Sequence, residues 1–113
     1  MNLIKNMRAK LALVVMSLLS AKAFAHYPIL NCKLGSNPES PSEVVCEASF
    51  SNLAKAPNVI MEVYSEDDEL ISEGHTDDNS IYTFERPDGV YFIIMDAGPG
   101  HVLEISDEEV VEI

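Results

Sequence analysis

The sequence predicts a single small all-β domain, an antiparallel β-sandwich of about seven strands. Apolar and polar residues alternate along almost every segment, without a sustained helical period. Clusters of Gly, Pro, Ser, Asp and Asn interrupt these segments at intervals of roughly 8–12 residues, the spacing of strands in a sandwich. The chain has 113 residues, which is a length typical of one domain.

Residues 1–25 are expected to be a secretory signal peptide. Three basic residues precede a short apolar run at 11–19, and the small-residue motif Ala-Phe-Ala follows at 23–25. A membrane span needs about 20 apolar residues, so this run is too short to be one. Cleavage after Ala25 would leave the β-sandwich domain, residues 26–113, in the periplasm or secreted, with no stable membrane insertion.

Charge is divided unevenly between these two parts. Four of the seven basic residues precede residue 26, whereas all nineteen acidic residues follow it. Residues 26–113 retain Lys33, Lys55 and Arg86 and carry a formal charge of −16, compared with −12 for the whole chain. Such a domain repels nucleic acid and anionic lipid, which we exclude as partners. It would attract cations or a basic protein surface, or the charge serves only to keep it soluble.

The first two strands carry the only two cysteines. Cys32 lies on the apolar face of an expected strand at 30–34, and Cys46 on the apolar face of another at 44–50, with a loop at 35–43 between them. In an exported protein such a pair usually forms a disulfide, here a buried one between neighbouring strands. The closed loop of about 15 residues would be worth roughly 3 kcal/mol. The alternative is a pair of metal ligands.

Five further strands complete the pattern. A connection at 51–58 with room for one helical turn precedes them. Arg-Pro-Asp-Gly at 86–89 predicts a hairpin turn. The segment that follows is apolar on both faces, which predicts a central strand, and the end of the chain predicts an edge strand or a tail. The strands are expected at 59–65, 70–76, 81–85, 90–97 and 101–106.

The stretch GHTDDNSIYTFERPDGVYFIIMDAGPGH, residues 74–101, contains Thr-Asp, then Tyr-x-Phe, a Pro-x-Gly turn and an aromatic-led strand. This order resembles the transthyretin-like or carboxypeptidase-regulatory-like β-sandwich, over residues 57–105. Ser80 stands where that family usually has Gly, so the turn must avoid a positive φ there or accept strain. The resemblance implies a fold and not a chemistry. The matching residues are Thr76, Asp77, Tyr82, Phe84, Pro87, Gly89 and Tyr91.

A narrower resemblance bears on function. Ala25-His26 and the Gly-Pro-Gly-His sequence at 98–101 are similar to features of small exported domains associated with nickel and cobalt uptake. A mature chain that starts at His26 is also similar to periplasmic copper-binding β-sandwiches. These resemblances imply binding or delivery of a divalent transition metal: nickel, copper or cobalt.

The three histidines, His26, His101 and His75, are the candidate metal ligands, in that order. After cleavage, His26 would offer its α-amine, with a pKa of about 8, and its ring Nδ1 to one ion. A second histidine from another strand would complete a nitrogen-rich site suited to Cu(II) or Ni(II), and less selectively to Zn(II).

Each histidine also has a purely structural interpretation. His26 is then only the residue at which the leader ends. His101 is then a partly buried ring bonded to a backbone carbonyl, and His75 an exposed polar residue beside the turn at 76–79.

Catalysis is not expected. The sequence lacks a G-x-S-x-G motif, a C-x-x-C pair and a glycine-rich phosphate loop. The acidic turns at 66–69 and 77–79 do not have the spacing of a dedicated calcium loop. The alternative to metal binding is a non-catalytic acidic interaction domain that docks a basic envelope or transporter protein.

Overall fold

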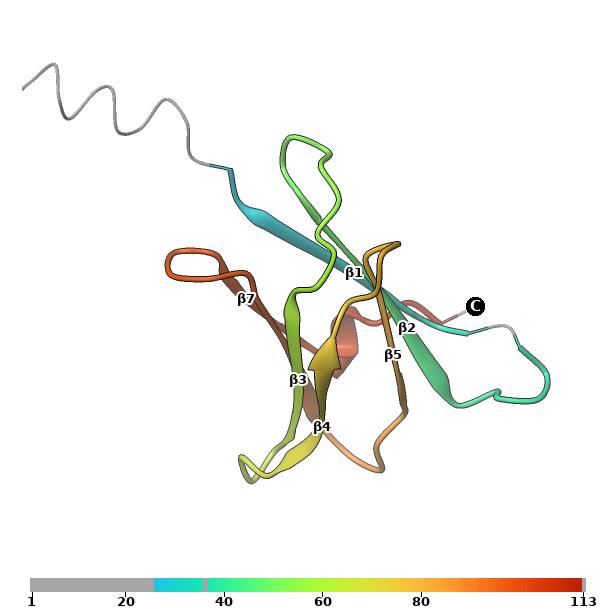
Figure 1. Cartoon of the computed structure of the whole chain (residues 1–113). Helices are drawn as coiled ribbons and strands as arrows, with labels where there is room; N and C mark the ends of the chain where they lie inside the picture. The colour runs from blue at the N-terminus through green and yellow to red at the C-terminus, as the bar shows by residue number, and fades with distance from the viewer. Residues whose placement is uncertain (1–25, 36, 113) are drawn as a thin grey trace, which may run out of the picture.

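Seven strands form two antiparallel sheets in this computed structural model, which describes residues 26–35 and 37–112 (Figure 1). The predicted all-β class is therefore confirmed, while the expected signal peptide at 1–25 lies outside the described residues. The elements are β1 (Pro28–Leu34), β2 (Glu43–Phe50), β3 (Ile60–Ser65), β4 (Leu70–His75), β5 (Ile81–Glu85), β6 (Tyr91–Asp96), β7 (Val102–Ser106) and the 3₁₀ helix η1 (Asp107–Glu109).

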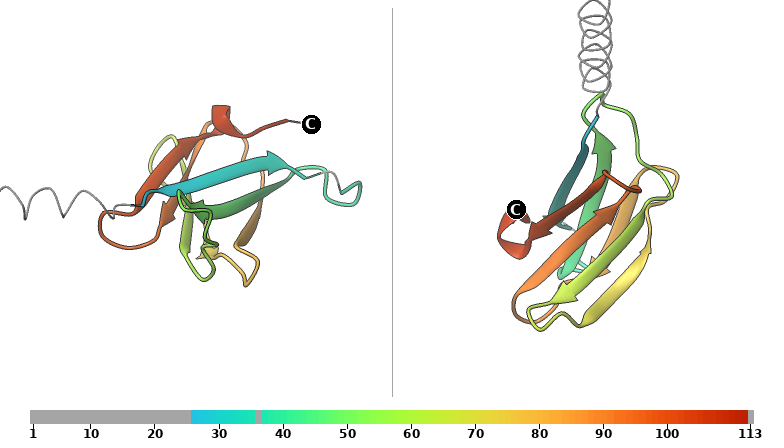
Figure 2. Two further views of the ribbon diagram at one scale, coloured as in Figure 1. Left: turned by 90° about the horizontal axis from the view of Figure 1, so that it is seen from above. Right: turned by 90° about the vertical axis from the view of Figure 1, so that its left-hand side faces the viewer.

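The two sheets pack face to face as a sandwich (Figure 2). One sheet has the strand order β1-β2-β5 and the other β4-β3-β6-β7. Successive side chains of a strand point to opposite faces, so every second residue enters the core. Met61 and Val63 of β3 and Ile93 and Met95 of β6 are completely buried, and half-buried residues lie between them. The alternation of apolar and polar residues in the sequence thus corresponds to the alternation of core-facing and outward-facing side chains in the sandwich.

Cys32 and Cys46 form the predicted disulfide. They lie directly opposite each other in the register of β1 and β2, and their sulfur atoms are 2.02 Å apart. Both residues are buried in the core. The disulfide that was predicted from the position of both cysteines on apolar strand faces is therefore confirmed. Their alternative role as thiolate metal ligands does not apply, because both sulfur atoms are in the disulfide.

The predicted hairpin at 86–89 is wrong. β5 pairs with β2, whereas β6 pairs with β3 and β7, so the Arg-Pro-Asp-Gly stretch connects one sheet to the other. A Pro and a Gly show where the chain bends, but long-range pairing decides which strand the next one joins. The prediction of a central strand is confirmed, since β6 lies between β3 and β7.

The C-terminal segment, expected to be an edge strand or a tail, forms the 3₁₀ helix η1 and then a single bridge to β1. After η1, Val111 forms an isolated parallel bridge with Lys33 at the edge of β1. The Leu34 N–H donates to the Val111 carbonyl and the Val111 N–H to the Cys32 carbonyl, both at 3.0 Å. The connection at 51–58 contains two turns, one bend and an isolated bridge in place of a helical turn.

Tyr82 ties the two sheets together. Its hydroxyl is 2.5 Å from the Ser72 Oγ of β4, although Tyr82 itself belongs to β5. Gly74 makes this approach feasible, because a Cβ atom there would lie only 2.8 Å from the Tyr82 ring.

No helix in the described part of the chain has the length and hydropathy needed to cross a membrane.

Candidate functional site

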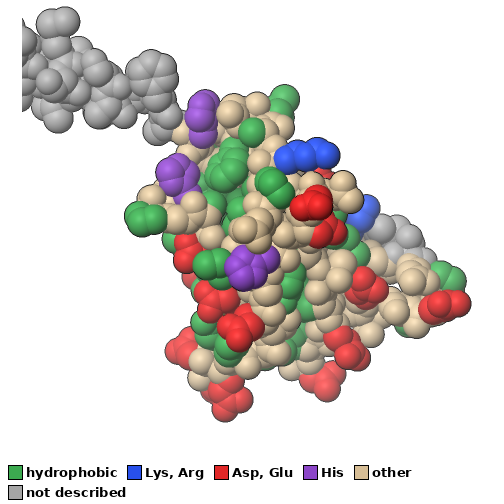
Figure 3. Space-filling model, viewed as in Figure 1, with side chains coloured by type: hydrophobic (Ala, Val, Ile, Leu, Met, Phe, Trp, Pro, Cys, Tyr) green, Lys and Arg blue, Asp and Glu red, His purple; other side chains and the backbone are tan. Residues whose placement is uncertain are grey.

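One end of the sandwich gathers the beginning of β1 and the connections that follow β2, β4 and β6. His26 precedes β1, His75 ends β4, and His101 immediately precedes β7, so all three histidines lie at this end. Histidine side chains are visible on one face in Figure 3. We call this region, with its loops at 51–59 and 97–101, the histidine end.

The 97–101 loop is a tight connection that fixes the position of His101. The Ala97 N–H donates to the His101 carbonyl at 3.0 Å, and the His101 N–H donates to the Gly98 carbonyl at 2.9 Å. Gly98 and Gly100 have φ angles of 108° and 78°, which other residues rarely adopt. The Gly-Pro-Gly sequence therefore holds His101 immediately before β7.

The imidazole of His101 is half-buried and held on two sides. Its ring meets the Phe50 ring edge-on, with centroids 6.3 Å apart and an interplanar angle of 85°. Its Nδ1 lies 3.1 Å from the Pro99 carbonyl oxygen. A carbonyl oxygen only accepts, so this hydrogen bond requires the proton on Nδ1. Nε2 is then the ring nitrogen that offers a lone pair.

His26 is exposed, but the chain is anchored one residue later. The Tyr27 N–H donates to the Ser51 Oγ at 3.1 Å, and the Ser51 N–H donates to the Tyr27 carbonyl at 2.9 Å. The next residue, Pro28, lies opposite Phe50 in the register of β1 and β2. Phe50 is therefore the link between the chain at His26 and the ring of His101.

His75 lies apart from this pair. It is exposed on the outer face of the four-stranded sheet, in a row with Ile60, Asp96 and Val102. Adjacent strands are about 4.8 Å apart, so three spacings, roughly 14 Å, separate the backbone of His75 from that of Val102. The structure thus relates His26 and His101 through Phe50, whereas His75 lies on the four-stranded sheet, opposite Ile60.

No group of three or more His, Cys, Asp or Glu side chains within residues 26–35 and 37–112 is arranged to hold a metal ion. The α-amine that cleavage before His26 would create is a backbone group and lies outside that set of side chains. A site at the histidine end would therefore use two imidazoles and this amine.

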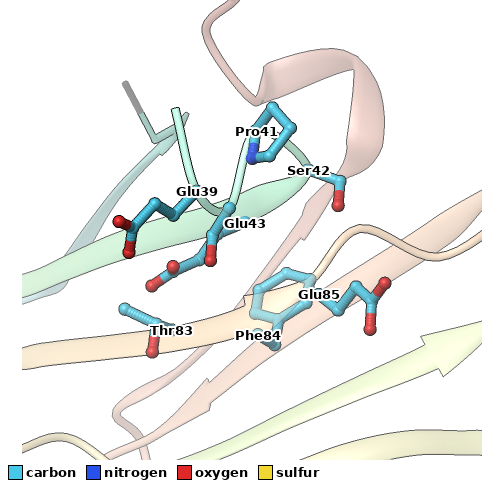
Figure 4. A pocket seen from close by; sticks show the side chains of 8 residues that line it. Glu39, Pro41, Ser42, Glu43, Thr83, Phe84 and Glu85 are labelled. Atoms are coloured by element: carbon cyan, nitrogen blue, oxygen red, sulfur yellow. The ribbon is translucent and has the colours of Figure 1, made fainter. Parts of the chain in front are cut away.

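A cavity of about 460 Å³ opens at the opposite end of the sandwich (Figure 4). Glu43 begins β2 and lies directly opposite Glu85, the last residue of β5, and Glu39 adds a third carboxylate from the loop. The neighbouring Arg86 is paired with Glu112 at 3.0 Å. This cavity is acidic and is separate from the histidine end.

Comparisons of the chain with protein-family models, curated proteins and solved structures gave no match. Function is therefore inferred from the side chains themselves.

Sequence reasoning overlooked one surface, the outer face of β3 and β6. A signal was present, because 90–97 is apolar on both faces; we read it only as a mark of burial.

Proposed function

We propose that this protein is an exported β-sandwich that binds or delivers a divalent transition metal (nickel, copper or cobalt) at the histidine end. The observation that supports this best is the position of Phe50, which lies opposite Pro28 and packs against the ring of His101. The chain two residues after His26 and the ring of His101 therefore both lie next to the same aromatic residue. The domain would act by binding and not by catalysis, in the periplasm or outside the cell.

The donors fit such an ion. Cleavage after Ala25 gives His26 a free α-amine, which together with its Nδ1 can chelate one ion, and Nε2 of His101 supplies a third nitrogen. Nitrogen-rich sets suit Cu(II) and Ni(II). The Tyr27 N–H is already donated to Ser51, so coordination would use the amine and imidazoles and spare this backbone amide.

Titration of the exported protein with Cu(II) or Ni(II), followed by calorimetry, tests the proposal after intact mass has defined the N-terminus. We expect one site that weakens at least about tenfold on His26→Ala or His101→Ala, since even outer-shell changes commonly cost 10–100-fold. An extra residue placed before His26 should weaken it similarly, because the chelating amine moves away.

His75→Ala is the matched control and should keep the affinity, since it removes an exposed histidine that lies opposite Ile60 and not beside Phe50. The proposal fails if the wild-type protein binds neither ion, or if the three histidine variants bind alike.

A further inference from the structure

The outer face of the four-stranded sheet carries apolar and acidic side chains in three rows. The right-hand view of Figure 2 looks onto this sheet. Cross-strand register defines the rows, and we call the whole set the outer sheet surface. The rows are His75, Ile60, Asp96 and Val102; Glu73, Glu62, Ile94 and Glu104; and Leu70, Tyr64, Phe92 and Ser106.

Apolar side chains on this surface are unusually accessible. Exposed faces of antiparallel sheets are normally polar. Here Ile60, Leu70 and Val102 are 43%, 46% and 57% exposed, and Phe92 and Ile94 between them are only half-buried. Such a patch, framed by polar groups, is typical of a site of protein interaction.

The charge of this surface is of one sign. Glu62, Glu73, Asp96 and Glu104 belong to its rows, and the strands β3, β4, β6 and β7 contain no Lys or Arg. In Figure 3, acidic and hydrophobic side chains are interspersed along the left and lower side of the molecule. A hydrogen bond to Glu62 raises the pKa of Tyr64, and partial burial and the charges of Glu62 and Glu73 raise it further. Two of the four carboxylates, those of Glu62 and Glu73, therefore act together on Tyr64.

The exposed apolar side chains and the carboxylates together indicate which kind of molecule would bind the outer sheet surface. A second copy of the chain would bring the same negative charge, and anionic lipid and nucleic acid are repelled for the same reason. A protein segment with both basic and apolar side chains complements both components: its Lys and Arg residues meet the carboxylates while its apolar residues cover Ile60, Ile94 and Phe92.

We propose that the outer sheet surface is the docking site for a basic amphipathic segment of a partner protein. Apolar contact supplies the buried area, and the rows of carboxylates set orientation and association rate. This proposal is independent of the metal site, because it uses β3, β4, β6 and β7 and needs neither His26 nor His101.

A labelled helix-forming peptide of leucine and lysine is the probe, with fluorescence anisotropy of the metal-free exported protein as the measurement. We expect binding that weakens as salt is raised, and no binding of the same peptide with glutamate in place of lysine. Absence of binding by the lysine peptide would overturn the proposal.

Charge reversal locates the site. Glu73→Lys combined with Glu104→Lys should weaken the lysine peptide at least about tenfold, a difference of about 1.4 kcal/mol. The matched control, Glu47→Lys with Glu85→Lys, makes the same change in net charge on exposed residues of the other sheet and should leave binding in place. An equal loss of peptide affinity in both variants would show that the peptide is attracted by net charge alone, which would contradict the proposal.

The apolar contribution has its own test. Ile60→Ser should weaken the peptide, whereas Leu53→Ser, at a more exposed apolar residue of the 51–59 loop, should not. Should a charge variant fail to fold, amide chemical-shift changes in the wild-type protein decide the matter. Changes centred on β3 and β6 support the proposal, and changes centred on β2 and β5 overturn it.

Discussion

Ser80 occupies a left-handed backbone conformation, with a φ of 67°, and is only 1% exposed. Its Oγ accepts a hydrogen bond from the Ala56 N–H at 2.9 Å, and its carbonyl accepts one from the Ala48 N–H at 2.9 Å. The sequence left two outcomes open for this turn, and the strained one is observed. The hydroxyl offsets that strain by satisfying a buried donor.

Two substitutions at Ser80 separate the strain from the hydrogen bond. Ser80→Ala keeps the strain and leaves the Ala56 N–H without its partner, so it should lower the free energy of unfolding by about 1–3 kcal/mol. Ser80→Gly also loses the hydroxyl but relieves the left-handed strain, worth about 1–2 kcal/mol, and should be the more stable variant. Urea denaturation measures both. Equal stabilities would contradict the assignment of strain to this residue.

Thr76, four residues earlier, is buried for a similar reason. Its Oγ1 accepts from the Val59 N–H at 2.9 Å and donates to the Ala56 carbonyl at 2.6 Å. Ser80 and Thr76 together fasten the connection between β2 and β3 to the turn between β4 and β5. Both residues therefore stabilise the loops of the histidine end through hydrogen bonds to the backbone, and neither is a candidate ligand.

At the scale of elements, the β1–β2 pair depends on its disulfide. The bridge joins residues separated by 14 positions, and the loop between them, 35–42, lies outside both strands. A small domain buries a limited share of its surface, so one crosslink is a large part of its stability.

The double variant Cys32→Ala and Cys46→Ala should therefore lose roughly 3 kcal/mol of unfolding free energy, the value for a loop of this length. Chemical denaturation measures it, and alanine avoids burying new hydroxyl groups. Reductant should lower the stability of the wild-type protein by a similar amount and leave the double variant unchanged. Two titratable thiols in the denatured, unreduced wild-type protein would show that the bridge is not formed in solution.

The 97–101 loop illustrates how one element sets a candidate ligand. Sequence reasoning placed His101 within a strand, but β7 begins at Val102 and His101 closes the preceding loop. Its ring consequently packs on Phe50 at the end of the core. The glycines on either side of Pro99 make this possible through their positive φ angles.

At the scale of the whole molecule, two tyrosines link stability to alkaline pH. Burial is the main cause that raises the pKa of Tyr91, and a hydrogen bond to Glu62 is the main cause for Tyr64. Both hydroxyls thus hold their protons to a higher pH in the folded protein than in the unfolded chain, where they titrate near 10.0. Stability contributed by these groups is complete below that pH and is lost as pH rises through the folded pKa values.

The melting temperature should consequently fall as pH increases above about 10. Thermal melts at constant ionic strength measure the fall. Tyr64→Phe removes one of the two titrating hydroxyls, so its melting temperature should fall less steeply than that of the wild-type protein. Identical slopes would mean that general charge repulsion, and not the environment of Tyr64, governs the alkaline transition.

Much of the architecture could be predicted because it follows from local patterns. Alternation, together with one segment that is apolar on both faces, located all seven strands to within two residues at each end, and alternation put Cys32 and Cys46 on the same side. The partner of β5 and the parallel bridge of Val111 could not be predicted, because each depends on chain segments more than 30 residues away. The apolar outer positions of β6 were visible, but their exposure depends on whether another layer covers them.

The sequence by itself determined the all-β class, the facing of the cysteines, the acidic surface and the three candidate ligands, since composition and a period of two are local properties. Only the tertiary structure decided that Phe50 lies opposite Pro28 and against the ring of His101, that His75 lies opposite Ile60, and that carboxylates and apolar residues of four strands share one surface. The physical reason is that strand order and register bring distant residues together, and these are set by packing of the complete core.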